Sequence, residues 1–372
     1  MVSKNAHGDG AKLINIITIC SNNFGNRLQN LALTKILRNM TNEPVVTLRI
    51  RDHKPFQSVI NKNWKALSIT KSTLLGLFRK RNRTSIPFLT FTFTHIPTIQ
   101  ICPENMNDLE GLFVIGSDQC WNPGWGLGAR IDGAQCAMGV SPKRKIAYAA
   151  SMGIKLEDFP REWRERYASW LPEIESISMR EEDGAHAVHE FVGRTVPVVL
   201  DPTMLLETVE WLAIERKPTD EKHLEGDYCL KYVLGSSTEA DRIERIAAEN
   251  GLSVFDINNT SKPIGPAEFL WLVHHAKIVC TDSFHGSVFS LLFHRPFVIF
   301  NRQDSYVDMS SRFETLENFS QVQAHRIDDD EFSWDAVWNM NWKRFETELA
   351  ARRADSRAWL EAAIKKARTQ NE

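Results

Sequence analysis

Short apolar runs alternate with stretches of helical periodicity along this chain. The runs are "LINIITIC", "PVVTLRI", "LFVIGSD", "KIAYAAS", "SISMR", "VPVVLDP", "YCLKYVLG", "LSVFDI", "KIVCTD" and "PFVIFN". Several are continuously apolar, as expected for strands that are covered on both faces. Helical patterns such as "GNRLQNLALTKILRNM" and "STEADRIERIAAENG" lie between them. This alternation predicts an α/β protein with mainly parallel sheets.

The chain has 372 residues, a length that suggests two domains at roughly 100–200 residues each. We expect an N-terminal domain over residues 1–175, a second domain over residues 176–330 and C-terminal helices over residues 331–372. Trp334, Trp338 and Trp342 follow one another at intervals of four, which places them on one face of a predicted helix. We expect this face to pack against a domain rather than to stack on a ligand.

Residues 54–98 fit the alternation less well. The segment "NWKALSITKSTLLGLFRKRNR" mixes apolar and basic residues. It is interpreted as a helical insertion, with two alternatives open. A solvated helical hairpin is favoured, and a patch that contacts an anionic membrane surface is the other reading.

Composition narrows the function classes. The net charge of −2 argues against a general nucleic-acid binder. No apolar run approaches the roughly 20 residues that span a membrane, and the start "MVSKNAHGDGAK" lacks the apolar core of a secretory signal. We therefore expect a cytoplasmic protein. The six cysteines are scattered without metal-ligand spacing, so we expect reduced core thiols and no metal site.

In open α/β sheets, ligands bind beyond the carboxyl ends of the strands, and the cleft between two such domains is the default site. The first strand leads into a polar turn that contains Asn23, Gly25 and Asn26. Free N–H groups at the following helix N-terminus suit a ligand. An ordinary capped turn explains the same residues equally well.

The stretch "FVIGSDQCWNPGWG" is richer in candidate chemistry. Asp118 and Gln119 are suited to binding hydroxyl groups, and Trp121 is suited to stacking on a sugar ring. A structural turn with a buried tryptophan is the alternative, and the functional reading is favoured.

Two further strand ends carry charged residues. Arg180 is suited to clamping a phosphate or carboxylate through its planar fork. From the local sequence alone, an ion pair with Glu181 or Glu182 is the favoured reading. Asp201 follows "VPVVL" and is suited to binding a ligand or to capping the turn, and the cap is favoured.

The stretch "TDSFHGSVF" is the most informative. Asp282 or Ser283 can cap a new helix, whose first N–H groups then suit an anion such as a phosphate. Gly286 keeps the approach open, and a histidine such as His285 can exchange protons near neutral pH. The position at a strand end favours a functional over a structural histidine.

Two arginines follow the last strand, in "NRQDSYVDMSSRFETL". Arg302 and Arg312 are each suited to completing an anion site. Surface salt bridging is an equally good explanation for either one.

Together these segments resemble a known family. "GNRLQNLAL", "FVIGSDQCWNP", "KIAYAASMG", "ISMREEDG", "VLDPTMLL", "TDSFHGSVFSLLFHRPF" and "SSRFETL" occur in the order seen in polysaccharide pyruvyl transferases, over residues 13–320. The resemblance implies two Rossmann-like domains in a glycosyltransferase-B-like arrangement. It also implies transfer of a pyruvyl group from phosphoenolpyruvate to a sugar of a cell-surface polysaccharide or its precursor, as a ketal.

The resemblance further implies roles for single residues. His285 matches the family's histidine and Arg180 its arginine, with Ser283 and Gly286 in the same donor segment. A downstream basic residue binds the donor, and Arg302 and Arg312 are the candidates. On the acceptor side we expect the residues that follow the first-domain strands, namely Asn23, Asn26, Asp118, Gln119 and Trp121.

The expected partners are phosphoenolpyruvate and a sugar or lipid-linked oligosaccharide acceptor, with no cofactor, no metal and no nucleic acid. Peripheral contact with the inner face of a membrane stays open. A glycosyltransferase with a nucleotide-sugar donor is the alternative on the same fold, and a non-catalytic sugar- or nucleotide-binding protein is a second one.

Overall fold

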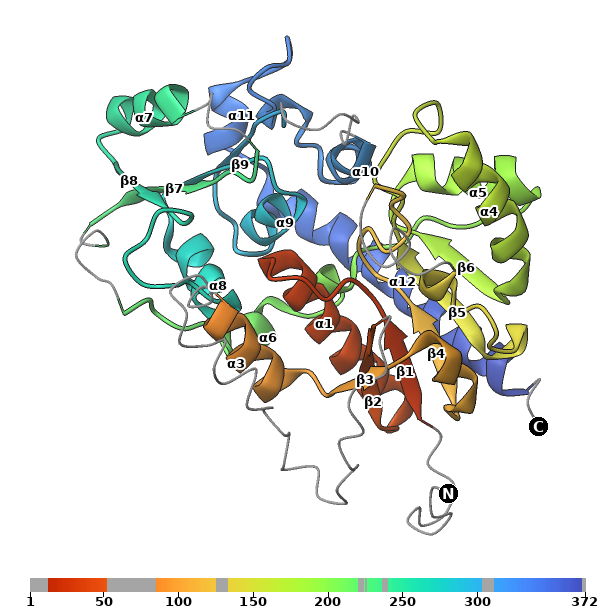
Figure 1. Ribbon diagram of the computed structural model, residues 1–372. Coiled ribbons are helices and arrows are strands. Elements are labelled where there is room, and N and C mark those ends of the chain that lie inside the picture. Colours follow the sequence, from red (N-terminus) through yellow and green to blue (C-terminus); the bar gives the residue numbers. More distant parts are fainter. Residues whose placement is uncertain are drawn as a thin grey trace.

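The protein contains two parallel β-sheets with helices on both faces of each (Figure 1). The computed structural model describes residues 13–51, 85–124, 133–219, 224, 226–235, 240–302 and 311–369, with the backbone alone at Ala240, Ser311 and Arg312. Most of the expected insertion, residues 54–84, lies outside the described residues.

The first sheet has the strand order β3-β2-β1-β4-β5-β6, and all its neighbouring strands are parallel. This is the order of a dinucleotide-binding Rossmann fold, in which β1 and β4 flank the topological switch point. The strands are β1 (Ile14–Ile17), β2 (Val45–Ile50), β3 (Thr98–Ile101), β4 (Leu112–Ile115), β5 (Lys145–Ala150) and β6 (Ser176–Met179).

The second sheet has the order β10-β9-β7-β8, again fully parallel. The strand order reverses between β7 and β9, so this pair flanks the second switch point. The strands are β7 (Tyr228–Tyr232), β8 (Ser253–Asp256), β9 (Ile278–Thr281) and β10 (Phe297–Ile299).

Helices cover both faces of each sheet. One face of the first sheet packs on α1 and α12, and its other face packs on α4 and α5. The second sheet packs on α8 and α9 on one face and on α7 and α11 on the other. The helices are α1 (Phe24–Thr41), α3 (Ile86–His95), α4 (Arg161–Trp170), α5 (Glu182–Val192), α6 (Thr208–Leu212), α7 (Ala240–Glu249), α8 (Pro266–His275), α9 (Phe284–Leu292), α10 (Ser311–Ser320), α11 (Trp334–Trp338) and α12 (Trp342–Thr369). Among the described helices, none is both long and apolar enough to cross a membrane.

The structure corrects the expected domain boundary at residue 176. Strand β6 (Ser176–Met179) pairs with β5 and is the edge of the first sheet. The second sheet begins only at β7. The local sequence could not show this, because a buried parallel strand has the same composition in either sheet.

Two strand predictions were also wrong. The run "VPVVLDP" forms only an isolated bridge between Met179 and Val198. Strand β3 (Thr98–Ile101), which begins where the segment 54–98 ends, was not predicted, since "TIQI" is half-exposed at the sheet edge and lacks a strong apolar signal.

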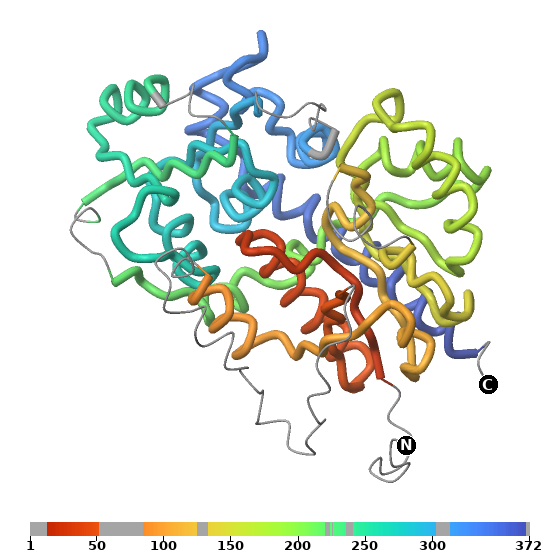
Figure 2. Tube along the Cα trace, in the orientation of Figure 1, coloured from red at the N-terminus to blue at the C-terminus, as the bar shows by residue number. Residues whose placement is uncertain are grey.

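The C-terminal tail returns to the first domain. Helix α12, the long blue helix in Figures 1 and 2, runs from the second unit back along the first sheet. The Ser356 hydroxyl accepts a hydrogen bond from the Leu200 N–H at 3.0 Å, and Arg353 pairs with Glu207 at 2.7 Å. Near its end, Lys366 pairs with Glu175 at 2.8 Å. The expected two-domain, glycosyltransferase-B-like arrangement is confirmed.

The predicted tryptophan face is interrupted. Helix α11 ends at Trp338, and α12 begins at Trp342. Trp334 and Trp338 pack against the core of the second sheet, whereas Trp342 stacks on His294 with ring centroids 4.7 Å apart. All three pack on protein, as expected, but they do not form one helical stripe.

One apolar core joins the two domains. Phe24, the first residue of α1, stacks on Phe269 of α8 with ring centroids 4.8 Å apart, and it also contacts Tyr232 of β7 at 5.6 Å. The core of the inner helices of both domains is continuous through this contact. The strand ends of the two sheets are therefore held in a fixed relation.

We expect Phe24→Ala to lower the free energy of unfolding by about 3–5 kcal/mol, because it removes a buried aromatic side chain that links the domains. Urea unfolding monitored by circular dichroism measures the change. Phe93→Ala is the matched control, since Phe93 is 61% exposed, and its effect should stay within about 0.5 kcal/mol. Equal effects of the two substitutions would contradict the shared core.

Candidate active site

The carboxyl ends of the two switch-point strand pairs meet at the N-termini of α1 and α9. The first turn of α1 packs directly on the His285 ring, since a Cβ atom at Gly25 would overlap Nδ1 of that ring. Glycine is therefore required at position 25 by the close approach of His285. This contact brings the predicted acceptor-side and donor-side segments together.

Side chains cap both helices at this junction. Asn23 caps α1 by accepting a hydrogen bond from the Asn26 N–H at 3.2 Å. Ser283 caps α9 by accepting one from the Gly286 N–H at 3.4 Å. Asn23, predicted on the acceptor side, and Ser283, predicted on the donor side, each make a capping contact that orients a helix end.

Gly286 has a packing role that differs from the expected one. A Cβ atom at this position would overlap the Thr281 hydroxyl. The glycine thus lets α9 pack closely on the end of β9, rather than opening a path for a ligand.

Arg180 lies at the centre of a buried ion-pair network. Its Nη1 is 3.2 Å from Asp118 Oδ1 and 3.1 Å from Asp201 Oδ2, and its Nη2 donates to the Ser151 hydroxyl at 3.1 Å. Glu181 Oε2 lies 3.6 Å from Arg180 Nε. The ion pair with Glu181, the reading that the local sequence favoured, is confirmed, whereas a clamp of Arg180 on a ligand phosphate or carboxylate stays a prediction.

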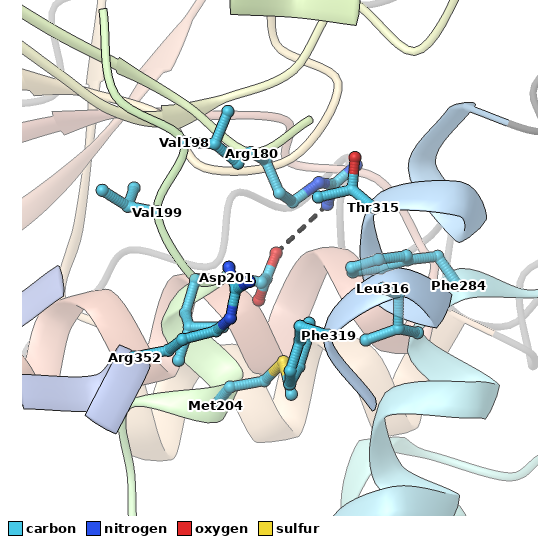
Figure 3. Close-up of a pocket in the computed structure, with 11 residues that line it drawn as sticks. Arg180, Val198, Val199, Asp201, Met204, Phe284, Thr315, Leu316, Phe319 and Arg352 are labelled. Carbon is cyan, nitrogen blue, oxygen red and sulfur yellow. Dashed lines mark hydrogen bonds and ion pairs between the residues drawn. The ribbon is translucent and has the colours of Figure 1, made fainter. Parts of the chain in front are cut away.

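The other face of the Arg180 network borders a small pocket (Figure 3). The Arg180 guanidinium lies over the Phe284 ring at 4.4 Å. The pocket has a volume of about 20 Å³, roughly the space of one water molecule. Leu316 and Phe319 of α10 and Arg352 of α12 complete its lining.

His285 lies beside this network. Its Nε2 is 3.6 Å from Asp201 Oδ2, which is an ion-pair distance but too long for a hydrogen bond. The residue is 5% exposed, and its Nε2 has no hydrogen-bond partner among the described residues. The imidazole is thus buried between the Asp201 carboxylate, which its Nε2 faces, and the first turn of α1, on which its Nδ1 packs.

The network fixes the charge states of its members. Burial alone would raise the pKa of Asp118 and of Asp201, but the charges of Arg180 and His285 outweigh it and hold the pKa of both carboxyl groups below their usual range. Burial likewise disfavours the charged form of Arg180, and the surrounding carboxylates reverse this and raise its pKa. Both aspartates are ionised and Arg180 is cationic at neutral pH.

Asp118 connects the network to the first domain. Asn26 donates its side-chain amide to Asp118 and accepts a hydrogen bond from the Ser21 hydroxyl. Asp118 adopts φ 65°, a left-handed conformation that is uncommon outside glycine but tolerated by aspartate. Asn26 and Asp118, two of the predicted acceptor-side residues, therefore lie in direct contact with the Arg180 network.

Gln119 and Trp121, the other two predicted acceptor-side residues of this segment, are buried in the first domain. Gln119 is 5% exposed and packs so closely on Gly153 that a Cβ atom there would overlap its amide. Trp121 is fully buried, and its indole donates to the Gln135 carbonyl at 3.1 Å. The predicted sugar stacking by Trp121 was wrong, because its ring is part of the first-domain core beside Tyr167.

Arg302 is tied to the second switch point. Its Nε pairs with Asp282 Oδ2 at 3.1 Å. The Asp282 carboxylate also accepts the N–H groups of Leu234 and Gly235, at 2.7 and 2.8 Å, at the end of β7. Arg302 is thus near the N-terminus of α9, as expected for a donor-site residue. The Arg312 side chain lies outside the described part of the chain.

Asp201, which the sequence predicts chiefly as a turn cap, is the central carboxylate of the site. Its Oδ1 accepts hydrogen bonds from Thr203, as the predicted turn cap would, while its Oδ2 faces Arg180, His285 and the Ser117 hydroxyl. Its position after the apolar run "VPVVL" was the same signal that identified Asp118 and Asp282. One carboxylate serves as both cap and ion-pair partner.

Among the described residues, one side-chain group has metal-ligand spacing. Glu215, His274 and His275 offer ligand atoms within 4.8 Å of one another. The histidines end α8 and immediately precede β9, so they lie at the amino edge of the second sheet. This group is therefore not part of the cleft at the carboxyl ends of the strands.

We expect Asp201→Asn to lower the free energy of unfolding at pH 7 by about 3–5 kcal/mol, because it uncouples a buried guanidinium from its carboxylate. The pKa of Asp201 is lower in the folded than in the unfolded chain. Its stabilising effect is therefore complete above the unfolded value of about 3.9 and is lost as the pH falls below it.

Thermal unfolding of wild type and variant should thus differ most at pH 7 and begin to converge as the pH falls below about 4. Asp158→Asn, at an exposed position, is the control that should show neither effect. A gap that stays constant down to pH 3 would contradict an ionised Asp201 in the native state.

Similarity to known structures is distant. The fold is similar to a putative UDP-N-acetylglucosamine 2-epimerase from Listeria monocytogenes, at 8% identity and TM-score 0.49, over 84% of this chain and 83% of that one. It is also similar to the UDP-GlcNAc 2-epimerase from Neisseria meningitidis bound to UDP-GlcNAc, at 11% identity and TM-score 0.40, over 93% and 99% of the two chains. Similarity at this level does not indicate function.

At the sequence level, most of the chain matches one protein family. Among curated proteins, none matches this chain. A family model described as polysaccharide pyruvyl transferase matches residues 23–305. The matched range includes Asp118, Arg180, Asp201 and His285, the residues that meet in the cleft. Because the match covers most of the chain, the protein belongs to the polysaccharide pyruvyl transferase family, a family of enzymes.

Proposed function

We propose that this enzyme transfers the pyruvyl group of phosphoenolpyruvate to two hydroxyls of a sugar, forming a pyruvate ketal and releasing phosphate. The observation that carries this proposal is the setting of His285. It lies at the N-terminus of α9, 3.6 Å from the ionised Asp201 and against the first turn of α1. A proton-exchanging group, an anion-binding helix end and the acceptor-side domain therefore meet at one point.

The donor would bind at the second switch point. The N-terminus of α9 provides backbone N–H groups and a positive dipole end for the phosphate. Arg302, held by Asp282 at 3.1 Å, would add a cation for the phosphate or carboxylate. Ser283 would act by fixing the end of the helix.

Arg180 would act chiefly through its carboxylates. Its Nη groups already contact Asp118, Asp201 and Ser151. In the proposed site it places Asp201 beside His285 and contributes positive charge below the donor. Direct contact with the donor through Arg180 stays a prediction of the resemblance.

The reaction needs balanced proton movements. His285 gives a proton to C3 of the enol, which becomes a methyl group while C2 becomes oxocarbenium-like. One sugar hydroxyl attacks C2 and loses its proton, the C2–O bond to phosphate breaks, and a second hydroxyl attacks C2 and loses its proton. One of these two protons returns to His285 and the other leaves with phosphate. Asp201 would face the imidazole during proton transfer, and Asp118 would help to orient the acceptor hydroxyl.

Mass spectrometry tests the proposed function directly. The purified enzyme is incubated with phosphoenolpyruvate and a panel of galactosides, mannosaminides and glucosides, and released phosphate is measured in parallel. We expect a product with a pyruvyl ketal and one phosphate per ketal. Thermal shifts with UDP- and GDP-sugars but not with phosphoenolpyruvate, and no ketal, would instead favour a glycosyltransferase.

We expect His285→Gln to lower kcat by about 10²–10⁴-fold, because glutamine retains hydrogen bonding but cannot exchange a proton. Steady-state phosphate release measures the effect. His189→Gln, on an exposed position of α5, is the matched control and should leave kcat unchanged. Wild-type kcat in His285→Gln would refute the proton-transfer role.

We expect Gly25→Ala to lower kcat by about 10²-fold in a folded protein, because the new methyl group displaces the His285 ring. The effect should act through His285. The double variant with His285→Gln should therefore be no slower than His285→Gln alone. Independent, multiplicative losses would show that Gly25 acts elsewhere.

A further inference from the structure

A second cationic group lies in the first domain, on the face of α1 that turns toward β2. Thr47 of β2 donates its hydroxyl to Asn30 of α1 at 2.8 Å, which fixes the facing sides of the two elements. Arg27 precedes Asn30 by three residues and lies on the same side of the helix. Arg49 follows Thr47 by two residues and lies on the same side of the strand. The helix runs antiparallel to the strand (Figure 1), so the two guanidinium groups are neighbours near the carboxyl end of β2.

Among the described residues, the buried Arg27 has no acidic partner. It is 3% exposed, and its Nε has no hydrogen-bond partner among the described residues. Between Leu13 and Arg51 the sequence contains a single carboxylate, Glu43. That residue follows the far end of α1 and pairs with Arg368 at 2.7 Å. Asp118, at the near end, is engaged by Asn26 and Arg180.

In the part of the chain that the structure describes, the titratable polar groups beside Arg27 are Cys20 and Arg49. Cys20, at the end of the first-strand segment, lies beside both arginines, and burial raises the pKa of its thiol despite them. The thiol is therefore neutral at pH 7. Burial and the like charge of Arg49 lower the pKa of Arg27, as expected for a buried cation with a neighbouring cation.

A buried, unpaired guanidinium is costly, and it is normally matched by an anion. Paired arginines bind phosphate groups through parallel hydrogen bonds. We propose that Arg27 and Arg49 bind the phosphate or diphosphate of an acceptor sugar, so that the acceptor is an activated sugar phosphate rather than a neutral glycan. This inference rests on the proposed function for the identity of the ligand, since α1 presents Gly25 to His285 and Arg27 to the acceptor-side sheet.

Pyrophosphate is the probe for this subsite. Its binding is measured by isothermal titration calorimetry in saturating phosphoenolpyruvate without acceptor, so that the donor site is already filled. We expect wild type to bind pyrophosphate, and Arg49→Gln and Arg27→Met each to weaken binding by about 10–100-fold with an unchanged affinity for phosphoenolpyruvate. Arg38→Gln, which removes a charge from the exposed last turn of α1, should bind pyrophosphate as wild type does.

The melting temperature separates a binding role from a structural one. In phosphate-free buffer, Arg27→Met should raise Tm, because it removes a buried unpaired charge. A lower Tm, or a failure to fold, would overturn the assignment of Arg27. Unchanged pyrophosphate binding in Arg49→Gln, or a weakened affinity for phosphoenolpyruvate instead, would overturn the subsite.

Matched acceptors identify the source of the phosphate. The same sugar is supplied as a neutral glycoside, a 1-phosphate, a nucleoside diphosphate and a short polyprenyl diphosphate. We expect the diphosphates to have the lower KM in wild type, and this advantage to disappear in Arg49→Gln. The diphosphate with the lower KM identifies whether the phosphate comes from a nucleotide sugar or a lipid carrier. Equal KM values for neutral and phosphorylated acceptors would contradict the proposal.

Failure of this inference is distinguishable from failure of the proposed function. If no ketal is formed with any acceptor, the proposed function fails. The calorimetric comparison of wild type, Arg49→Gln and Arg38→Gln with pyrophosphate still decides whether the subsite exists.

Discussion

The buried charge network around Arg180 is the constraint on which the rest of the site depends. A guanidinium that is 4% exposed is tolerated because carboxylates from three separate segments of the first domain converge on it. Asp118 follows β4, Glu181 follows β6, and Asp201 follows the bridge at Val198. This convergence fixes the floor of the cleft. It also places an ionised carboxylate next to His285, which comes from the other domain.

The apolar core that joins the two domains stabilises this arrangement. Phe24 joins α1 to α8 and β7, and the next residue, Gly25, receives the His285 ring. Packing and chemistry are thus controlled by adjacent residues of one helix turn. A shift of α1 relative to α9 would change the hydrophobic contact and the position of the imidazole together. This coupling explains why a glycine without unusual backbone angles is required there.

Much of this was predictable from the sequence. Continuous apolar runs with intervening helical patterns predicted the parallel sheets, and "TDSFHG" predicted a capped helix with His285 in the cleft. The domain boundary, the role of Trp121 and the importance of Asp201 could not be derived locally. A strand does not encode which sheet it joins, an indole after a strand fits core and cleft equally, and a cap residue does not show what its second oxygen faces.

The central claim is that His285 protonates C3 of phosphoenolpyruvate. Reaction in D₂O with a competent acceptor, followed by mass spectrometry of the ketal, tests it most directly. The account predicts one deuterium in the pyruvyl methyl group in wild type. It also predicts that His285→Gln slows deuterium incorporation and phosphate release to the same degree. Deuterium incorporation at the wild-type rate in His285→Gln, or a wild-type ketal without deuterium, would contradict it.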